Sequence, residues 1–425
     1  MRVVIAMDSF KGSLSSLEAA DAVKEGLYRV FASAQARVMP LADGGEGTVE
    51  ALTAGMGGEI RSVTVTGPLG EPVTCRYGII RRKILPAEIL HTEKVKGGIW
   101  DKEAERSGAG EESLTKQTAV IEMAGAAGLT LIAPERRNPL FTTTFGVGEV
   151  IRDALERGCR HFLVGIGGSA TNDGGAGMLQ ALGYGFLDRE GKQIPFGARG
   201  LERLEQITDT HVIPGLKESE FEIACDVENP LCGPDGCSAV YGPQKGADED
   251  MVRRMDQWMA RYALLAGRRY PAADPQRKGA GAAGGLGFGF LTFTRARLES
   301  GVQIVLRETG MEEEIRNADL VITGEGRLDA QTAMGKAPLG VARLADRYGK
   351  PVLAFAGSVT RDARACNACG IHAFFPILRG VTTLGEAMEK ENARMNLADT
   401  AEQAFRCFAA GRDGVKERNC SGKDS

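Results

Sequence analysis

The stretch RVVIAMDSFKGSLSSLE, residues 2–18, predicts a strand, a loop and the first turn of a helix in immediate succession. Its apolar run at 2–6 is short and uninterrupted, which is typical of a strand buried on both faces of a sheet. Ser15 and Glu18 then form a capping-box pattern. The apolar residues of the helix that follows recur at helical spacing: Ala19, Ala22, Val23 and Leu27. A strand, a glycine-containing loop and a helix in this order indicate an α/β fold.

The same order of elements returns at other places in the chain. Further strands are expected at 36–41, 319–322, 351–356 and 372–377, and helices from about residues 48 and 337. Strands that alternate with helices predict a parallel sheet with helices on both faces. In such sheets ligands bind at the carboxyl ends of the strands. The glycine-rich loops of this chain follow the predicted strands at those ends.

The middle of the chain follows a different pattern. Antiparallel strands are expected near 60–80 and 118–123, and a helix at 147–157 precedes a strand at 161–165. We interpret this region as a second α/β domain that is inserted into the first. A small-molecule active site is then expected in the cleft between the two domains.

These patterns set the expected domain organisation. The predicted boundaries are 1–66 plus 288–410 for the discontinuous first domain, 67–287 for the inserted domain, 81–117 for a surface insertion within it, and 412–425 for a disordered tail. The insertion is charged and lacks sustained periodicity, and the tail is polar. Neither segment is therefore expected to contribute to a core.

Composition and charge argue against two classes of function. A net charge of −4 over 425 residues argues against electrostatic binding of nucleic acid, and no apolar run approaches the ~20 residues that span a bilayer. The N-terminus has no basic segment followed by an apolar stretch, so we expect a cytoplasmic protein. The nine cysteines are scattered, with Cys366 and Cys369 the only pair at metal-binding spacing, and we interpret them as reduced thiols.

The first candidate site is the loop Asp8–Ser13. Lys11 precedes a helix N-terminus, where a lysine and free backbone N–H groups suit a phosphate or a carboxylate. Asp8, at the end of a strand and beside Ser9, suits a metal ion or a proton. The alternative is a turn with a surface lysine and a helix cap.

The second candidate site is the loop at 43–47. Gly44 and Gly45 allow the backbone to approach a ligand closely, and Asp43 and Glu46 can hold Mg²⁺ directly or through water. The alternative is a tight turn whose acidic residues are favoured by the helix dipole.

The third candidate site reads GIGGSATND at 165–173. Residues 165–170 match the G-x-G-x-x-A fingerprint, with Asp188 at about the spacing of a dinucleotide site, so an NAD-linked dehydrogenase is the enzymatic alternative. Against it, Asp173 would repel a pyrophosphate, and the glycines within 174–177 disfavour a first helical turn. We prefer a loop that holds a small polyoxygenated ligand. Its candidate binding residues are Gly167, Gly168, Ser169, Thr171 and Asn172.

The fourth candidate site, TGEGRLDAQTAMGK at 323–336, contains the charges that phosphoryl transfer needs. It resembles a Walker A loop only at its end, since Ala330 stands where that motif requires its first glycine. Arg327 and Lys336 suit negatively charged oxygens, whereas Glu325 and Asp329 suit a metal ion. The alternative is a loop at a helix start with paired surface charges.

Seven ordered motifs together resemble the bacterial glycerate kinase family (type 1, glycerate 2-kinase): DSFKGSLSS, PLADGGEGT, RNPLFTTTFGVGEVI, GIGGSATNDGGAGMLQALG, ACDVENPL, GAGAAGGLGFG and TGEGRLDAQTAMGKAP. The likeness runs from Met1 to about Phe408. It implies ATP, Mg²⁺ and D-glycerate, 2-phosphoglycerate as the product, and two unlike α/β domains of which one is Rossmann- or flavodoxin-like. Family members usually have a short turn where this chain has the 81–117 insertion.

Under this resemblance the candidate residues take separate roles. The cations expected to face phosphate or the glycerate carboxylate are Lys11, Arg327 and Lys336. The expected Mg²⁺ ligands are Asp43, Glu46, Glu325 and Asp329. The candidates for the base that accepts the hydroxyl proton are Asp8, Asp173 and Asp226, with Asp173 preferred. D-Glycerate is the expected partner, self-association stays open, and a nucleotide sensor without turnover is the non-enzymatic alternative.

Overall fold

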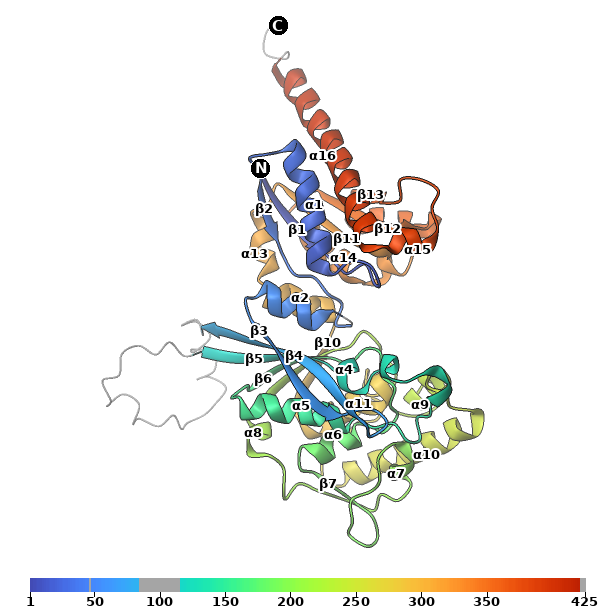
Figure 1. The fold of residues 1–425 in the computed structure, drawn as a ribbon. Coiled ribbons are helices and arrows are strands. Elements are labelled where there is room, and N and C mark those ends of the chain that lie inside the picture. The colour runs from blue at the N-terminus through green and yellow to red at the C-terminus, as the bar shows by residue number, and fades with distance from the viewer. Residues whose placement is uncertain (46, 84–114, 421–425) are drawn as a thin grey trace, which may run out of the picture. The chain divides into compact units, whose positions relative to one another are not determined.

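The computed structural model describes residues 1–45, 47–83 and 115–420, and its internal contacts divide the chain into two units. The first unit comprises Met1–Met56, Ala224–Asp226 and Glu299–Ser425; the second comprises Gly57–Ile223 and Val227–Leu298. Each unit combines helices with a sheet that contains parallel strands (Figure 1), which confirms the predicted α/β class. Within the described residues, no helix is long and apolar enough to cross a membrane.

A five-stranded parallel sheet forms the centre of the first unit. Its strands in spatial order are β13 (Ala373–Pro376), β12 (Val352–Val359), β11 (Leu320–Leu328), β1 (Arg2–Met7) and β2 (Gln35–Val38). Ile5 of β1 pairs with Ile322 of β11, which in turn pairs with Leu353 of β12. Residues 3–7 are all buried, as expected for a central strand covered on both faces.

Two long helices cover one face of this sheet. α1 (Ser16–Val30) begins at the predicted capping box, in which the Ser15 hydroxyl accepts a hydrogen bond from the Glu18 N–H. α16 (Lys390–Cys420) packs along α1, and apolar side chains of both helices join alternate strand residues in one core. Gly26 permits this packing, since a Cβ there would lie 2.4 Å from a backbone oxygen of α16.

Shorter helices complete the first unit. α14 (Ala337–Asp346) packs against β1, β11 and β12, and both α12 (Gly301–Glu308) and α13 (Met311–Arg316) pack against α14. The remaining elements are α2 (Thr48–Gly55), α15 (Leu384–Met388) and the 3₁₀ segments η4 (Thr332–Met334) and η5 (Arg361–Cys369). The helices predicted from about residues 48 and 337 are therefore confirmed.

The second unit is built on a six-stranded sheet. Its order is β10 (Arg295–Glu299), β9 (Glu220–Ala224), β6 (His161–Gly165), β5 (Thr115–Glu122), β4 (Pro72–Lys83) and β3 (Glu59–Thr66). β3, β4 and β5 pair antiparallel, whereas β5 and β6 pair parallel. β7 (Gly185–Leu187) and β8 (Gln206–Thr208) form a separate antiparallel pair.

The second unit also contains helices, which lie beside its sheet (Figure 1). The α-helices are α4 (Ala124–Ala127), α5 (Phe145–Glu156), α6 (Ala176–Ala181), α7 (Ala198–Leu201), α8 (Pro214–Lys217), α9 (Cys237–Tyr241), α10 (Glu249–Gly267) and α11 (Ala282–Phe293). The 3₁₀ turns are η1 (Leu129–Leu131), η2 (Pro134–Arg136) and η3 (Pro243–Lys245).

The segment at 323–327 differs from its prediction. The sequence predicts a loop there, but β11 continues to Leu328, and Arg327 still pairs with β12. The glycines that suggest a loop instead allow close contact between strands, since a Cβ at Gly324 would lie 2.1 Å from a backbone oxygen of β12. Because residues two apart on a strand share a face, Glu325 and Arg327 lie on the same side of the sheet.

The two units also differ in extent from the predicted domains. β3 pairs with β4 in the second sheet, so the second unit begins at Gly57 rather than at residue 67. It also contains α11 and continues to Leu298, beyond the predicted end at 287. The expected location of the active site between the domains stays a prediction.

Two predicted peripheral segments fall only partly within the described residues. Residues 412–420 continue α16, so the prediction of a disordered tail is wrong for them, and 421–425 lie outside the described residues. The ends of the predicted insertion, 81–83 and 115–117, pair with each other in β4 and β5, as expected for an extended hairpin. Its remainder, 84–114, lies outside the described residues.

Candidate active site

A cavity of about 380 Å³ lies at the carboxyl ends of the parallel strands of the first unit. Its polar lining residues are Asp8, Ser9, Lys11, Ser13, Asp43, Glu325, Arg327, Lys336 and Ser358. Three of the four predicted sites therefore contribute to one cavity. Their convergence follows from the parallel sheet, which places the loops after β1, β2 and β11 at one edge.

Asp8 is held at the end of β1 by hydrogen bonds with backbone groups. Its N–H donates to the carbonyl oxygen of Gly324 at 2.8 Å, and its Oδ1 accepts from the N–H of Ser9 at 2.7 Å. The side chain is only 7% exposed, and this burial, followed by the negative charge of Asp43, raises the pKa of Asp8 to about 7. Asp8 is therefore a carboxyl group that can accept or release a proton near neutral pH.

Glu325, Asp329 and Lys336 form a compact charged group around the end of β11. The Thr332 hydroxyl donates to Glu325 at 2.6 Å, and Lys336 Nζ lies 3.5 Å from Glu325 and 3.6 Å from Asp329. Burial raises the pKa of Glu325, against the opposing effect of Thr332 and Lys336. Arg327 Nε lies 3.4 Å from the other Asp329 oxygen. The predicted charges of this motif are therefore brought together.

Asp43 faces the cavity from the loop before α2. Its Oδ1 accepts from the Gly45 N–H at 2.8 Å, and its Oδ2 lies 3.9 Å from Lys11 Nζ. Gly44 adopts a φ of +87°, and a Cβ there would lie 2.5 Å from the Ala224 side chain, so only glycine fits this position. Glu46, the other predicted metal ligand of this loop, lies outside the described residues.

Asp226 belongs to the first unit and follows β9. Desolvation raises its pKa and the charge of Asp43 adds to this effect, whereas hydrogen bonds from Ser300 and Gly301 oppose it. Asp226 is not among the described residues that line the cavity. Asp226 is thus near Asp43 but is less suited than Asp8 to a reaction inside this cavity.

The carboxylates of the cavity can be compared with the ligands that Mg²⁺ prefers. The described residues contain no group of three or more His, Cys, Asp or Glu side chains that could hold a metal ion. The negative charges of Asp43 and Glu325 nevertheless both raise the pKa of Asp8, so the three carboxyl groups interact. This donor set fits Mg²⁺, which binds proteins through one or two carboxylates and otherwise through water and nucleotide phosphates.

The loop between β6 and α6 in the second unit is mostly buried. Thr171, Asn172 and Asp173 are at most 1% exposed, whereas Gly167 and Gly168 are exposed and Ser169 is buried. The Asp173 carboxylate accepts hydrogen bonds from the N–H and the hydroxyl of Thr144 and from the N–H groups of Gly175 and Gly177. Burial raises the pKa of Asp173 against these bonds. Asp173 is therefore placed to hold this loop in its conformation.

This loop also bears on the dehydrogenase alternative. A dinucleotide fingerprint places its glycines at the N-terminus of the helix that follows the strand. Here the glycines at 165–168 end well before α6, which begins at Ala176. The pyrophosphate geometry of that motif is therefore lacking in this loop.

Lys245 anchors the same loop from η3. It is 2% exposed, and its Nζ donates to the carbonyl oxygen of Thr171 at 2.7 Å. Burial lowers its pKa from 10.5 to about 8. Sequence reasoning missed this residue, because a lysine in a Pro-Gln-Lys-Gly turn has no pattern that distinguishes it from a surface lysine.

Replacing Lys245 with Met is expected to remove a pH dependence of stability. Between pH 8 and 10 the unfolded chain binds more protons at this lysine than the folded one, so the contribution of Lys245 to the free energy of unfolding should rise with pH, by up to roughly 3 kcal/mol. Lys245→Met should lack this rise. Urea unfolding at pH 7.5 and 9.5 measures it; parallel behaviour of the two proteins would contradict the burial of a titrating lysine.

Part of the cavity lining is apolar, and sequence reasoning missed it. These residues are Phe10, Ile377, Leu378, Leu384, Ala387, Met388 and Ala393. Except for Phe10 they lie after β13, in a stretch without a glycine-rich motif. The signal that could have found them is the presence of large apolar residues directly after the last strand of a parallel sheet.

The cavity defines a class of protein: an α/β protein with lysine, arginine and carboxylate side chains at the carboxyl ends of a parallel sheet, which suits a phosphorylated ligand. Comparisons with known proteins extend this result. Residues 3–409 match the model of the glycerate kinase family. A glycerate kinase of Bacillus subtilis (strain 168) is 46% identical over 96% of this chain and 97% of its own length.

Two further relatives agree. A glycerate 2-kinase of Escherichia coli (strain K12) is 44% identical over 91% of this chain and 93% of its own. A crystal structure from Salmonella typhimurium LT2 superposes with a TM-score of 0.82 at 42% identity, over 97% of this chain and 99% of that one. The chain belongs to the glycerate kinase family. None of these comparisons supports the dehydrogenase or the non-catalytic alternative.

Proposed function

We propose that this protein transfers the γ-phosphoryl group of ATP to the 2-hydroxyl group of D-glycerate, producing 2-phosphoglycerate and ADP. The observation that carries the proposal is the single cavity in which Lys11, Arg327 and Lys336 lie with Asp8 and other carboxylates. Phosphoryl transfer needs neutralised charge and a positioned acceptor more than covalent chemistry. Membership of the family and the relative named glycerate 2-kinase support this choice of reaction.

We assign the base to Asp8 rather than to Asp173. The glycerate hydroxyl oxygen attacks the γ-phosphorus, the bond from that phosphorus to the β–γ bridging oxygen breaks, and the hydroxyl proton passes to Asp8. A pKa of about 7 suits a base near neutral pH. Asp173, in contrast, is 1% exposed and occupied by hydrogen bonds from its own unit.

The three cations of the cavity would stabilise the negative charge. Lys336, at the N-cap of α14, and Lys11 are suited to phosphate oxygens, and Arg327 lies on the same strand face as Glu325. Asp43 and Glu325 are the carboxylates that would hold Mg²⁺, which when bound neutralises phosphate charge. Thr332 keeps Glu325 oriented through its hydrogen bond.

The proposal predicts glycerate-dependent release of ADP. A coupled assay with Mg-ATP and D-glycerate should show turnover, and phosphorus NMR of the product should show coupling to the single proton at C2 rather than to the two protons at C3. ATP binding without turnover would instead indicate a nucleotide sensor. Binding of a nicotinamide dinucleotide in place of ATP would indicate the dehydrogenase.

A further inference from the structure

The apolar part of the cavity is formed mainly by the segment after β13. We call Leu378, Leu384 and Met388, together with Phe10 and Ile377, the apolar wall. Leu384 is 76% exposed, Leu378 40% and Met388 38%, whereas Phe10 and Ile377 are buried. Large apolar side chains that are exposed beside a polar cavity indicate a ligand-binding surface.

The wall continues directly from the loop that carries Asp8 and Lys11. Phe10 belongs to this loop, and a Cβ added at Gly12 would come within 2.9 Å of Met388 Cε. One cavity therefore has cations and carboxylates on one part of its lining and leucine and methionine side chains on the other. A ligand that matches this lining has an anionic end and an apolar end.

The short helix of the wall is well defined by its own hydrogen bonds. The Thr383 hydroxyl accepts from the N–H of Glu386, and the Glu386 carboxylate accepts from the N–H of Thr383 in return, which forms a capping box at the start of α15. Asn392 donates to the Glu386 carbonyl oxygen at the other end. These bonds hold Leu384 and Met388 on one helical turn, four residues apart.

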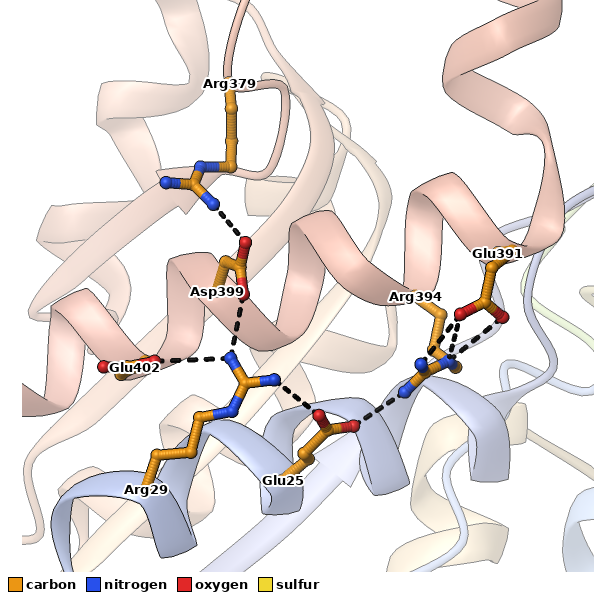
Figure 2. Close-up of polar contacts among 7 residues, drawn as sticks. All are labelled: Glu25, Arg29, Arg379, Glu391, Arg394, Asp399 and Glu402. Atoms are coloured by element: carbon orange, nitrogen blue, oxygen red, sulfur yellow. Dashed lines mark hydrogen bonds and ion pairs between the residues drawn. The ribbon is translucent and has the colours of Figure 1, made fainter.

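Packing between α1 and α16 fixes the apolar wall relative to the loop that carries Asp8 and Lys11. α16 continues from α15, and its apolar residues Leu397 and Phe405 lie in one core with Val23 and Leu27 of α1. Figure 2 shows the ion pairs along this contact: Glu25 with Arg394, Arg29 with Asp399 and Glu402, and Arg379 with Asp399. Such exposed pairs each contribute little, so the buried core supplies most of the rigidity.

We propose that the apolar wall binds the adenine base of ATP, so that the first unit holds both the base and the phosphates of the nucleotide. This inference rests on the proposed function. Adenine is a planar aromatic ring, which leucine and methionine side chains contact favourably. D-Glycerate has a carboxylate, two hydroxyl groups and three carbons, and its small apolar surface does not match a wall of several large side chains.

The proposal separates two parts of one binding site. Leu384→Ser should weaken ADP binding about fivefold or more, because apolar contact with the base is lost. Inorganic tripolyphosphate has no base, so its affinity should be unchanged in this variant. Val381→Ser is the matched control, since Val381 is a fully exposed apolar residue of the same segment that does not line the cavity.

Calorimetric titration of the wild-type protein and both variants with Mg-ADP and with tripolyphosphate tests this directly. Selective loss of ADP affinity in Leu384→Ser, with Val381→Ser unchanged, would support the wall as the base site, even if glycerate proved not to be the acceptor. Three results would overturn it: unchanged ADP affinity in Leu384→Ser, an altered KM for glycerate alone, or a change of oligomeric state in sedimentation that shows the wall to be a subunit contact.

Discussion

Replacing Asp8 with Asn is expected to lower kcat/KM by about 100-fold or more and, at the same time, to stabilise the protein at pH 8. The loss of activity follows from the removal of the proposed proton acceptor, since a positioned general base contributes roughly 10²–10⁴-fold. The gain in stability follows from burial: a folded-state pKa of about 7, against 3.8 in a model compound, means that the folded state disfavours the charged form.

The sign of this effect can be followed with pH. The stability associated with protonated Asp8 is complete below pH 4 and is lost as pH rises through 7, because the unfolded chain then holds an ionised carboxylate in water. Asp8→Asn should therefore gain on the wild type between pH 4 and 7, by at most roughly 4 kcal/mol. Urea unfolding at pH 4, 6 and 8 measures this difference.

Steady-state kinetics complete the test of Asp8. Wild-type kcat/KM should rise with pH through about 7, where the base loses its proton, and the remaining activity of Asp8→Asn should lack this step. Asp346→Asn, which changes an exposed residue at the end of α14, should leave activity and stability unchanged. Near-normal turnover in Asp8→Asn would exclude Asp8 as the base.

The parts of the site that could be predicted from the sequence are the residues that directly follow a strand in the chain. A strand followed by Asp8 and Lys11, or by Asp43 and two glycines, fixes the end of the sheet at which the loop lies. The convergence of these residues with Lys336 then follows from the parallel arrangement alone. No information on side-chain packing is needed for that step.

The parts that could not be predicted depend on packing between distant segments. Thr171 and Asp173 have the residue types of a ligand-binding loop, but both residues are buried. The Thr171 carbonyl oxygen accepts a hydrogen bond from Lys245, and the Asp173 carboxylate accepts one from Thr144. The apolar wall shows the reverse case. Leu384 and Met388 follow the last strand of the sheet without any binding motif, and the cavity that they line is the evidence for the proposed ligand contact.

Replacing Lys336 with Met is expected to lower kcat/KM about 100-fold, with a smaller effect on stability. In the described structure Lys336 is close to two carboxylates, Glu325 and Asp329, at 3.5 and 3.6 Å. Because it is partly exposed, these pairs should contribute no more than about 1 kcal/mol to folding. Against the developing charge of a phosphoryl group the same lysine is worth a few kcal/mol, since the interaction strengthens in the transition state.

A double variant and an arginine variant distinguish the two roles of Lys336. If the lysine balances the charge of Glu325, then Lys336→Met combined with Glu325→Gln should recover the stability that Lys336→Met loses. The kcat/KM of the double variant should stay low in either case, because Glu325 is also a proposed ligand of Mg²⁺. If Lys336 neutralises phosphate, Lys336→Arg should keep part of the activity because it keeps the positive charge. Lys217→Met, at an exposed position of α8, is the control for loss of a lysine as such. Turnover and urea unfolding of these four variants would therefore show whether the charged group at the end of β11 acts on the substrate. Full activity of Lys336→Met would show that catalysis does not depend on this lysine.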